Sequence, residues 1–227
     1  SSLVYPFLVQ ADRPHPTREG GRITVRSVPR AELCSSLGEN TAAVVFSHSQ
    51  SACGSLTGID EVTRAASEVG ALTVCDITQS VGWSPVDASA VDVTVCSAYK
   101  WMCHPRGVAY MTVSDRAMEA LVPVNAGWYA GEVIWDSMYG PAMQLSGRAS
   151  RFDVSPGWPL WPGAVAALAA VLTVTNAAGL PLSTARPLPA RRPRPVPAFR
   201  SAARPSGTAR GQARPARRDR ARTRPRD

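Results

Sequence analysis

The chain has 227 residues, 44% of them apolar, which is enough for one large domain or two small ones with a sizeable core. Its net charge of +8 arises at the C-terminal end: residues 181–227 hold 14 arginines and two acidic residues, a net charge of +12, whereas residues 1–180 carry −4. The main body is therefore mildly acidic, which argues against a basic nucleic-acid-binding surface there.

Cysteine usage and hydropathy bound the cellular setting. Five cysteines without CxxC pairs predict free, mostly buried thiols in a reducing cytosol rather than a disulfide framework or a zinc site, so we expect a cytoplasmic protein and no metal. The sequence contains no run of about 18 apolar residues, so we expect no membrane span. The first 16 residues lack the basic start of a signal peptide and an initiator Met, so we expect a chain entered in the middle.

The first 121 residues alternate short β-rich runs with helical patterns. Strands are expected at 22–28, 42–47, 71–75, 91–97 and 107–113, and helices at 29–37, 58–70 and 114–121. The helix at 58–70 has one apolar face, made of Ile59, Val62, Ala66 and Val69. Ser114 is expected to cap the helix at 114–121. Strands separated by helices predict an α/β fold with a mostly parallel sheet and flanking helices.

The rest of the chain differs in character. Residues 122–161 are rich in Gly, Pro and aromatics and predict a long ordered loop region, and residues 163–174 predict one helix. Residues 181–227 hold nine prolines and a single aromatic, which predicts disorder. We therefore expect a large-domain portion at 1–121, a loop-rich segment and helix at 122–180, and a disordered tail at 181–227. One hypothesis is that this tail is a frameshifted translation, which sequencing of the locus decides.

Polar residues follow three of the expected strands, and ligands in parallel sheets bind outside the carboxyl ends of the strands. Asp76, Gln79, Ser97 and Lys100 could therefore converge on one crevice. Lys100 is the only lysine in the chain. An amine can form a Schiff base with an aldehyde, whereas a guanidinium stays protonated and cannot. A lysine paired with an acid near a pyridine nitrogen is typical of pyridoxal phosphate (PLP) enzymes.

The stretch "VCDITQSVGWSPVDASAVDVTVCSAYKWMCHPRGVAYM" resembles the core of the class V aminotransferases, which include cysteine desulfurases, kynureninases and isopenicillin N epimerase-like proteins. Their pattern is a strand ending in D-x-x-Q-x-x-G and a second strand ending in S-x-[HY]-K before a Gly-containing turn. It is matched here by Asp76, Gln79, Gly82, Ser97, Tyr99, Lys100 and Gly107. The resemblance implies the large domain of PLP fold type I, incomplete at both ends.

The resemblance also implies roles for single residues. Lys100 would form the Schiff base and move the proton at the substrate's α-carbon, and Asp76 would hold the pyridinium. Gln79, with Ser51, would hydrogen-bond the phenolic oxygen of PLP. Ser97 would bind the phosphate.

Two further positions belong to the expected cofactor site. Tyr99 takes a place often held by His, which weakens the cysteine desulfurase interpretation. His48 follows a strand near the cofactor, and a packing or polar-contact role is favoured over catalysis. His104 and Arg106, in the turn after Lys100, are expected to be solvated.

The implied activity is PLP chemistry on an amino acid by epimerisation, transamination or a lyase reaction, in a homodimer and away from membranes. One alternative is an inactive, truncated remnant, because family members run to about 400 residues and the resemblance places a phosphate loop before this chain and a small domain after it. Another is binding of nucleic acid or an acidic partner through the Arg-rich tail, without sequence preference and with steep salt dependence.

Overall fold

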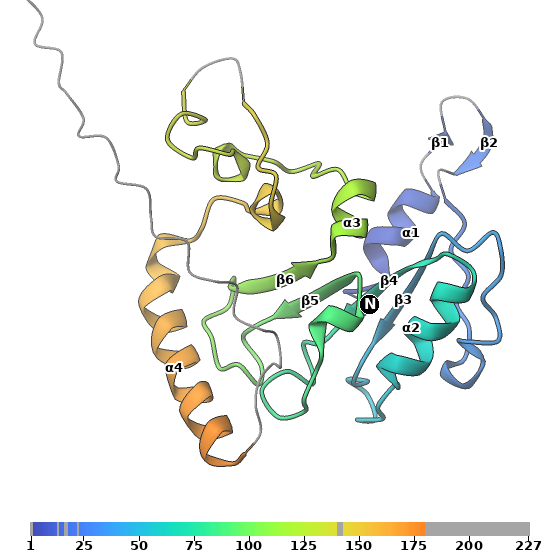
Figure 1. The fold of residues 1–227 in the computed structure, drawn as a ribbon, viewed down its shortest axis with the longest axis horizontal. Helices are drawn as coiled ribbons and strands as arrows, with labels where there is room; N and C mark the ends of the chain where they lie inside the picture. The colour runs from blue at the N-terminus through green and yellow to red at the C-terminus, as the bar shows by residue number, and fades with distance from the viewer. Residues whose placement is uncertain (1, 13, 16–17, 22, 140–142, 180–227) are drawn as a thin grey trace, which may run out of the picture. The chain divides into compact units, whose positions relative to one another are not determined.

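A four-stranded sheet organises the part of the chain that the computed structural model describes, residues 2–12, 14–15, 18–21, 23–139 and 143–179 (Figure 1). Its strands lie in the order β3 (Ala43–Ser47), β4 (Leu72–Asp76), β5 (Val93–Ser97) and β6 (Ala109–Val113). The pairs β3–β4 and β4–β5 are parallel, and β5–β6 is antiparallel. The expected tail at 181–227, and any binding through it, lies outside the described residues.

These four strands confirm the predicted ones to within two residues at each end. Their buried side chains include Val44 and Phe46 of β3, Cys75 of β4 and Cys96 of β5. The sheet is mostly parallel, as expected, and β6 departs from it for a geometric reason. Only the eleven residues 98–108 connect β5 to β6, and a parallel return would need a longer crossover connection.

Two of the elements predicted near the N-terminus do not form as expected. The strand expected at 22–28 is absent from residues 23–28, which are irregular and pair with no strand that the structure describes. The helix expected at 29–37 is reduced to the 3-10 turn η1 (Arg30–Glu32). The serine hydroxyls of Ser35 and Ser36 donate to the carbonyls of Glu32 and Leu33, a local alternative to continuing the helix.

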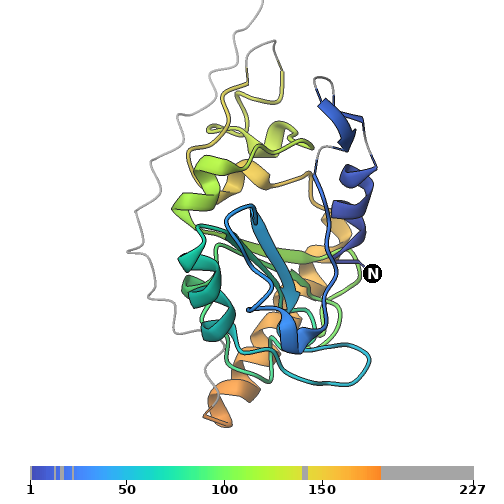
Figure 2. The same cartoon turned by 90° about the vertical axis from the view of Figure 1, so that its right-hand side faces the viewer.

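Residues before these turns form helix α1 (Tyr5–Ala11) and a short hairpin of β1 (Pro14–His15) and β2 (Arg18–Gly21). Helix α1 buries none of its side chains. Figure 2 shows α1 and α2 (Ile59–Glu68) on opposite sides of the sheet.

Helix α2 uses the apolar face that its sequence predicts. Val62 and Ala66 are buried in the core, and Ile59 and Val69 pack against it. The shorter helix α3 (Asp115–Ala120) begins at the expected cap, where the Ser114 hydroxyl accepts a hydrogen bond from the backbone N–H of Ala117 at 3.2 Å. These two helices therefore confirm the sequence prediction in position and in the way they are held.

The connection from α3 to the last helix is irregular, as expected. It contains the 3-10 turns η3 (Trp128–Ala130), η4 (Ala149–Phe152) and η5 (Trp158–Leu160), and an isolated bridge joins Gly131 to Leu145. A further 3-10 turn, η2 (Ala88–Ala90), precedes β5.

Helix α4 (Trp161–Ala177) is longer than the sequence suggested and is apolar on nearly every side. By length and composition alone, the helical stretch Trp158–Ala177 could cross a membrane, so the expectation that no such stretch exists was wrong. One side of α4 nevertheless packs on the core through Leu168 and Val171. Only Ala164 and Thr175 of this helix are buried among the described residues, so most of its surface is exposed.

The cysteines are free, as expected, but only two of the five are buried. Burial raises the pKa of Cys75 to about 12 and that of Cys96 to about 11, so both thiols stay protonated. Cys53 and Cys103 are exposed, which contradicts the expectation of mostly buried thiols.

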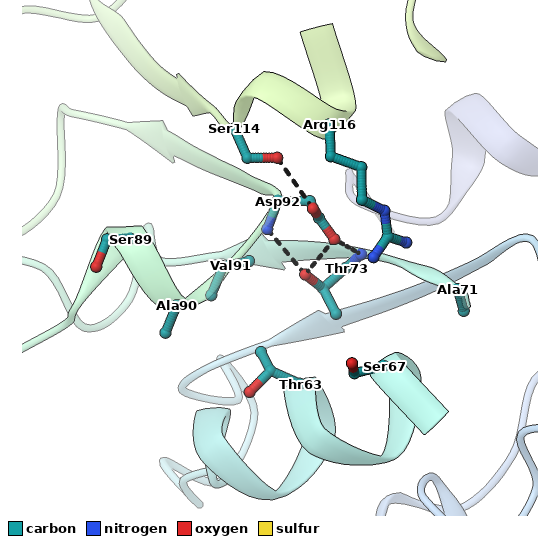
Figure 3. Close-up of a pocket in the computed structure, with 10 residues that line it drawn as sticks. All are labelled: Thr63, Ser67, Ala71, Thr73, Ser89, Ala90, Val91, Asp92, Ser114 and Arg116. Atoms are coloured by element: carbon teal, nitrogen blue, oxygen red, sulfur yellow. Dashed lines mark hydrogen bonds between the residues drawn. The ribbon is translucent and has the colours of Figure 1, made fainter. Parts of the chain in front are cut away.

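A partly buried hydrogen-bond network joins the elements at the end of the sheet where β4 and β5 begin. The carboxylate of Asp92 accepts bonds from the backbone N–H and hydroxyl of Thr73, at 2.9 and 3.0 Å, and from the hydroxyl of Ser114 at 2.9 Å (Figure 3). Burial opposes ionisation of Asp92, but the bonds from Thr73 and Ser114 outweigh it, and the pKa of this carboxyl lies below its ordinary value.

We predict that Asp92→Asn lowers the free energy of unfolding by about 1–2 kcal/mol at pH 7, because one accepting oxygen is lost from this network. Since the folded-state pKa is depressed, the contribution is present above the ordinary pKa of about 3.9 and disappears as the pH falls through the folded-state value. Urea denaturation at several pH values measures it. Asp136→Asn, in an exposed loop, is the control. An equal effect of both variants, or a difference that persists in acid, would contradict the prediction.

Candidate functional site

The carboxyl ends of the parallel strands bring the expected site residues to one edge of the sheet. Ser47, the last residue of β3, is in register with Asp76, the last residue of β4, and Ser97 ends the neighbouring strand β5. Lys100 follows Ser97 by three residues. Asp76, Ser97 and Lys100 therefore lie in the region where α/β sheets bind ligands.

The half-buried carboxylate of Asp76 is only partly used within the chain. Its Oδ1 accepts a hydrogen bond from the backbone N–H of Thr78 at 2.8 Å, which fixes the side chain, and no residue that the structure describes bonds to Oδ2. The hydroxyl of Thr78 in turn accepts the backbone N–H of Ser97 at 2.9 Å. Thr78 thus joins the ends of β4 and β5, a role that its position inside D-x-x-Q did not reveal.

Gln79 and Ser51, which were expected to act on the same atom, lie together. The side-chain amide of Gln79 donates to the hydroxyl of Ser51 at 2.9 Å, across 28 positions of sequence. The carbonyl of Gln79 accepts the indole N–H of Trp83 at 2.8 Å, which holds the turn after β4. The Gln79–Ser51 bond therefore joins the loop after β3 to the loop after β4.

His48 lies at the same edge and is buried, with 8% of its surface exposed. Its backbone N–H donates to the carbonyl of Asp76 at 3.0 Å, and its carbonyl accepts the N–H of Thr57 at 2.8 Å. Among the described residues, the ring atom Nδ1 has no hydrogen-bond partner although it is buried. Burial lowers the pKa of His48, which favours the neutral ring. A buried polar atom without a partner marks a place where a ligand or water would be stabilised.

Lys100 begins a tight turn. The carbonyl of Lys100 accepts the N–H of Cys103 at 2.9 Å, and Cys103 has a left-handed backbone with φ of 55°. The half-buried Lys100 amine lies 5.9 Å from the centre of the Tyr99 ring, and the Arg106 guanidinium lies 4.6 Å from the same ring. Both side chains thus lie within the range of cation–π interactions with the Tyr99 ring.

The Lys100 turn packs directly on the loop after β4. The indoles of Trp83 and Trp101 meet edge to face, with ring centres 6.1 Å apart. Gly82 has φ of 102°, and a Cβ placed there would lie 3.2 Å from the carbonyl oxygen of Trp101. A glycine at this point of the D-x-x-Q-x-x-G pattern therefore lets the two loops approach, whereas the paired indoles had no signal in the sequence.

The other side of the turn packs on the start of α4. Gly107 has φ of 101°, and a Cβ there would lie 2.9 Å from the side chain of Leu160. A Cβ at Gly163 would lie 2.7 Å from Pro105. Figure 1 shows α4 beside the connection between β5 and β6, in agreement with these approaches.

His104 was expected to be solvated, and this was wrong: the side chain is buried, with 4% of its surface exposed. Its ring Nδ1 is 2.6 Å from the carbonyl oxygen of Met102, and its Nε2 is 2.9 Å from the hydroxyl of Tyr110 on β6. Arg106 is exposed, as expected.

The donor set at this edge suits PLP in part. Within the described ranges it offers one primary amine, a carboxylate with a free oxygen, an amide–hydroxyl pair and a buried imidazole nitrogen without a partner. Ser97 is exposed, and none of the residues described donates to or accepts from its hydroxyl. Two shallow hollows lie elsewhere: one beside Asp92 and Arg116, at the opposite end of β4 and β5 (Figure 3), and one beside Met111 and Phe152.

The chain belongs to the class V aminotransferase family, whose model, described as "Aminotransferase class-V", matches residues 14–176. This match confirms the resemblance drawn from residues 74–111. PLP is the cofactor of this family, as the resemblance implied.

Two curated relatives show how far the similarity extends. A probable cysteine desulfurase 2 from Mycobacterium leprae is 32% identical over 148 residues, which are 63% of this chain and 33% of the relative. An isopenicillin N epimerase from Streptomyces clavuligerus is 28% identical over 100 residues, which are 43% of this chain and 25% of the relative. The chain thus spans about a third or less of the length of these relatives.

Solved structures agree on the fold. The cystine C–S lyase C-DES, in complex with cysteine persulfide, superposes with a TM-score of 0.53 and 24% identity, over 63% of this chain and 39% of that one. The Escherichia coli cysteine desulfurase CsdA gives a TM-score of 0.51 and 16% identity, over 63% and 35%. The expected PLP fold-type I large domain, with only part of its length present, is therefore confirmed.

We predict that Gly107→Ala destabilises the chain by about 1–3 kcal/mol, because it places a side chain at a positive φ and against Leu160. Guanidinium denaturation followed by tryptophan fluorescence measures the change. Gly147→Ala is the matched control, since Gly147 has no positive φ and a Cβ there meets nothing within 4 Å. Equal stability of the two variants would show that the turn is not held as described.

Proposed function

We propose that this chain carries the PLP platform of a class V aminotransferase-type enzyme, with Lys100 as the amine that binds the cofactor's aldehyde. The observation that carries the proposal is the position of the only lysine, on a turn that packs against the loop after β4; this loop follows Asp76 and carries Gln79, the partner of Ser51. Bound at such a site, PLP supplies an electron-accepting ring that makes the α-carbon of an amino acid acidic.

The chain's own residues would divide the work by their chemistry. The Lys100 amine would be the group that binds the cofactor's aldehyde, and it would also be placed to move the proton at the substrate's α-carbon. Asp76 is held through Oδ1 by Thr78, and its Oδ2, unbonded among the described residues, could accept a hydrogen bond from a protonated ring nitrogen. A negative charge at that atom keeps the ring nitrogen protonated and so strengthens electron withdrawal.

The remaining residues would hold the cofactor in register. Gln79 and Ser51 form a donor pair suited to a phenolic oxygen, and Ser97 offers a hydroxyl to the phosphate. Tyr99 lies beside the Lys100 amine and supports it through its ring face. His48, with its unpartnered Nδ1, would take a polar contact rather than a catalytic step.

The wider assignment is also a proposal. The substrate would be an amino acid, and the reaction an epimerisation, transamination or lyase step, as the named relatives suggest. We also propose that the protein forms a homodimer and acts in the cytosol. The chain spans a third or less of these relatives, so the proposal concerns the cofactor platform first.

We predict that incubation with PLP followed by borohydride reduction leaves a pyridoxyl group on the peptide that contains Lys100. Since Lys100 is the only lysine, the terminal amine is the sole competing primary amine and serves as an internal reference. At low PLP concentration the wild type should label at Lys100 in preference to the terminus, as measured by peptide mass spectrometry.

Lys100→Ala should abolish this adduct and leave terminal labelling unchanged, and Lys100→Arg should do the same while keeping the charge. Equal labelling of Lys100 and the terminus in the wild type would refute a preorganised site and support the interpretation of an inactive remnant.

We further predict that Asp76→Asn weakens retention of PLP by about tenfold or more, because the amide keeps the bond to Thr78 but loses the charge that holds the protonated ring. Equilibrium dialysis measures retention. Asp60→Asn, on the exposed start of α2, controls for the loss of one negative charge. Unchanged retention in Asp76→Asn would remove this residue from the site.

A further inference from the structure

A pair of side chains, the buried His104 and the partly exposed Tyr110, bridges the connection that carries Lys100. His104 lies in the turn after Lys100, and Tyr110 lies on β6, opposite Cys96 of β5. The His104 ring is 4% exposed and stands edge-on to the Tyr110 ring, with centres 5.5 Å apart. Neither residue belongs to the cofactor-binding set above, although both belong to the loop and strand that place Lys100.

The hydrogen bonds of His104 fix which nitrogen carries the proton. A carbonyl oxygen can only accept, so Nδ1, at 2.6 Å from the Met102 carbonyl, must be the donor there. In the neutral ring Nε2 then accepts from the Tyr110 hydroxyl at 2.9 Å. The imidazole is therefore a two-ended link between the turn and strand β6.

His104 is bonded on both sides of Lys100, through its backbone on one side and its ring on the other. On the preceding side, the N–H of Ala98 donates to the Val108 carbonyl at 3.0 Å, and the Ala98 carbonyl accepts the His104 N–H at 3.1 Å. On the following side, the Met102 carbonyl is held by the His104 ring. The residue that bears the amine thus sits between two backbone positions that His104 ties down, and Tyr110 ties His104 to the sheet.

We propose that His104 and Tyr110 are positioning residues that fix the direction of the Lys100 amine at the edge of the sheet. The inference rests on the proposed function only in taking that amine as the group that binds the cofactor. Loss of the Tyr110 hydroxyl removes the partner that the described residues give to Nε2 of the buried His104 ring, so the ring and the Met102 carbonyl it holds become freer to reorient. Lys100 then samples more directions, and binding that needs one direction weakens.

The decisive variant is Tyr110→Phe, which removes one oxygen and keeps the ring that packs on His104. Tyr139→Phe is the matched control, because Tyr139 is 85% exposed. His104→Gln is the conservative variant of the ring, since its amide oxygen can accept a hydrogen bond from the Tyr110 hydroxyl at about the place of Nε2. Far-UV circular dichroism and thermal unfolding establish that each variant folds.

The first readout needs no cofactor. Reductive methylation with ¹³C-formaldehyde labels only Lys100 and the terminal amine, so the methyl resonance of Lys100 can be followed in the cofactor-free chain. In the folded wild type, the chemical shift of this methyl resonance should differ from its value in the urea-unfolded chain. Tyr110→Phe should lose at least about half of that displacement, and Tyr139→Phe none of it. A wild-type signal at the urea position, or a Tyr110→Phe signal identical to wild type, overturns the proposal.

The second readout is the ratio of pyridoxyl label on Lys100 to that on the terminus at low PLP concentration. It should fall about fivefold or more in Tyr110→Phe, as expected for one lost hydrogen bond, and fall less in His104→Gln, which keeps an acceptor for the Tyr110 hydroxyl. A change in thermal stability alone, with both readouts at wild-type values, makes the pair merely structural and overturns the proposal. Lost displacement without any preferential labelling in the wild type upholds the positioning role and refutes the proposed function. Unchanged labelling of Tyr110→Phe on a wild type that does label upholds the function and refutes the positioning.

Discussion

The packing of the Lys100 turn against the loop after β4 is the constraint on which the site depends. Strand ends alone bring Asp76 and Ser97 to one edge, but Lys100 lies on an irregular connection that the sheet register does not place. The Thr78–Ser97 hydrogen bond, the edge-to-face contact of Trp83 with Trp101 and the close approach at Gly82 determine that placement. Each is a short-range contact that a small backbone shift would break.

The two ends of the sheet carry different kinds of polar chemistry. At the end where β4 and β5 begin, Asp92 is saturated by hydrogen bonds from neighbouring elements, so its charge stabilises the fold. At the opposite end Asp76 keeps one oxygen free, and His48 keeps a buried nitrogen without a partner among the described residues. Saturated polar groups stabilise a structure, whereas unsaturated ones leave capacity for a ligand.

Much of this could be predicted from sequence because it follows from local pattern. The four strands, the apolar face of α2 and the Ser114 cap depend on periodicity and capping chemistry, and all were found. The direction of β6 follows from the length of its connection only once the pairing is known. The prediction for residues 23–37 was wrong because a β-rich run forms a strand only beside a partner strand, and a helical run forms a helix only where its backbone hydrogen bonds continue. The burial of His104 was missed since it depends on Met102 and Tyr110, a contact across the loop that no spacing rule encodes.

The account's central claim is that the edge holding Asp76, Gln79 and Lys100 is a preorganised cofactor platform. A crystal structure of the borohydride-reduced protein after incubation with PLP tests it most directly. The account predicts a pyridoxyl group on the Lys100 amine with its ring nitrogen within hydrogen-bond distance of the free oxygen of Asp76. A pyridoxyl group on the terminal amine alone, or one on Lys100 with its ring turned away from Asp76, would contradict it.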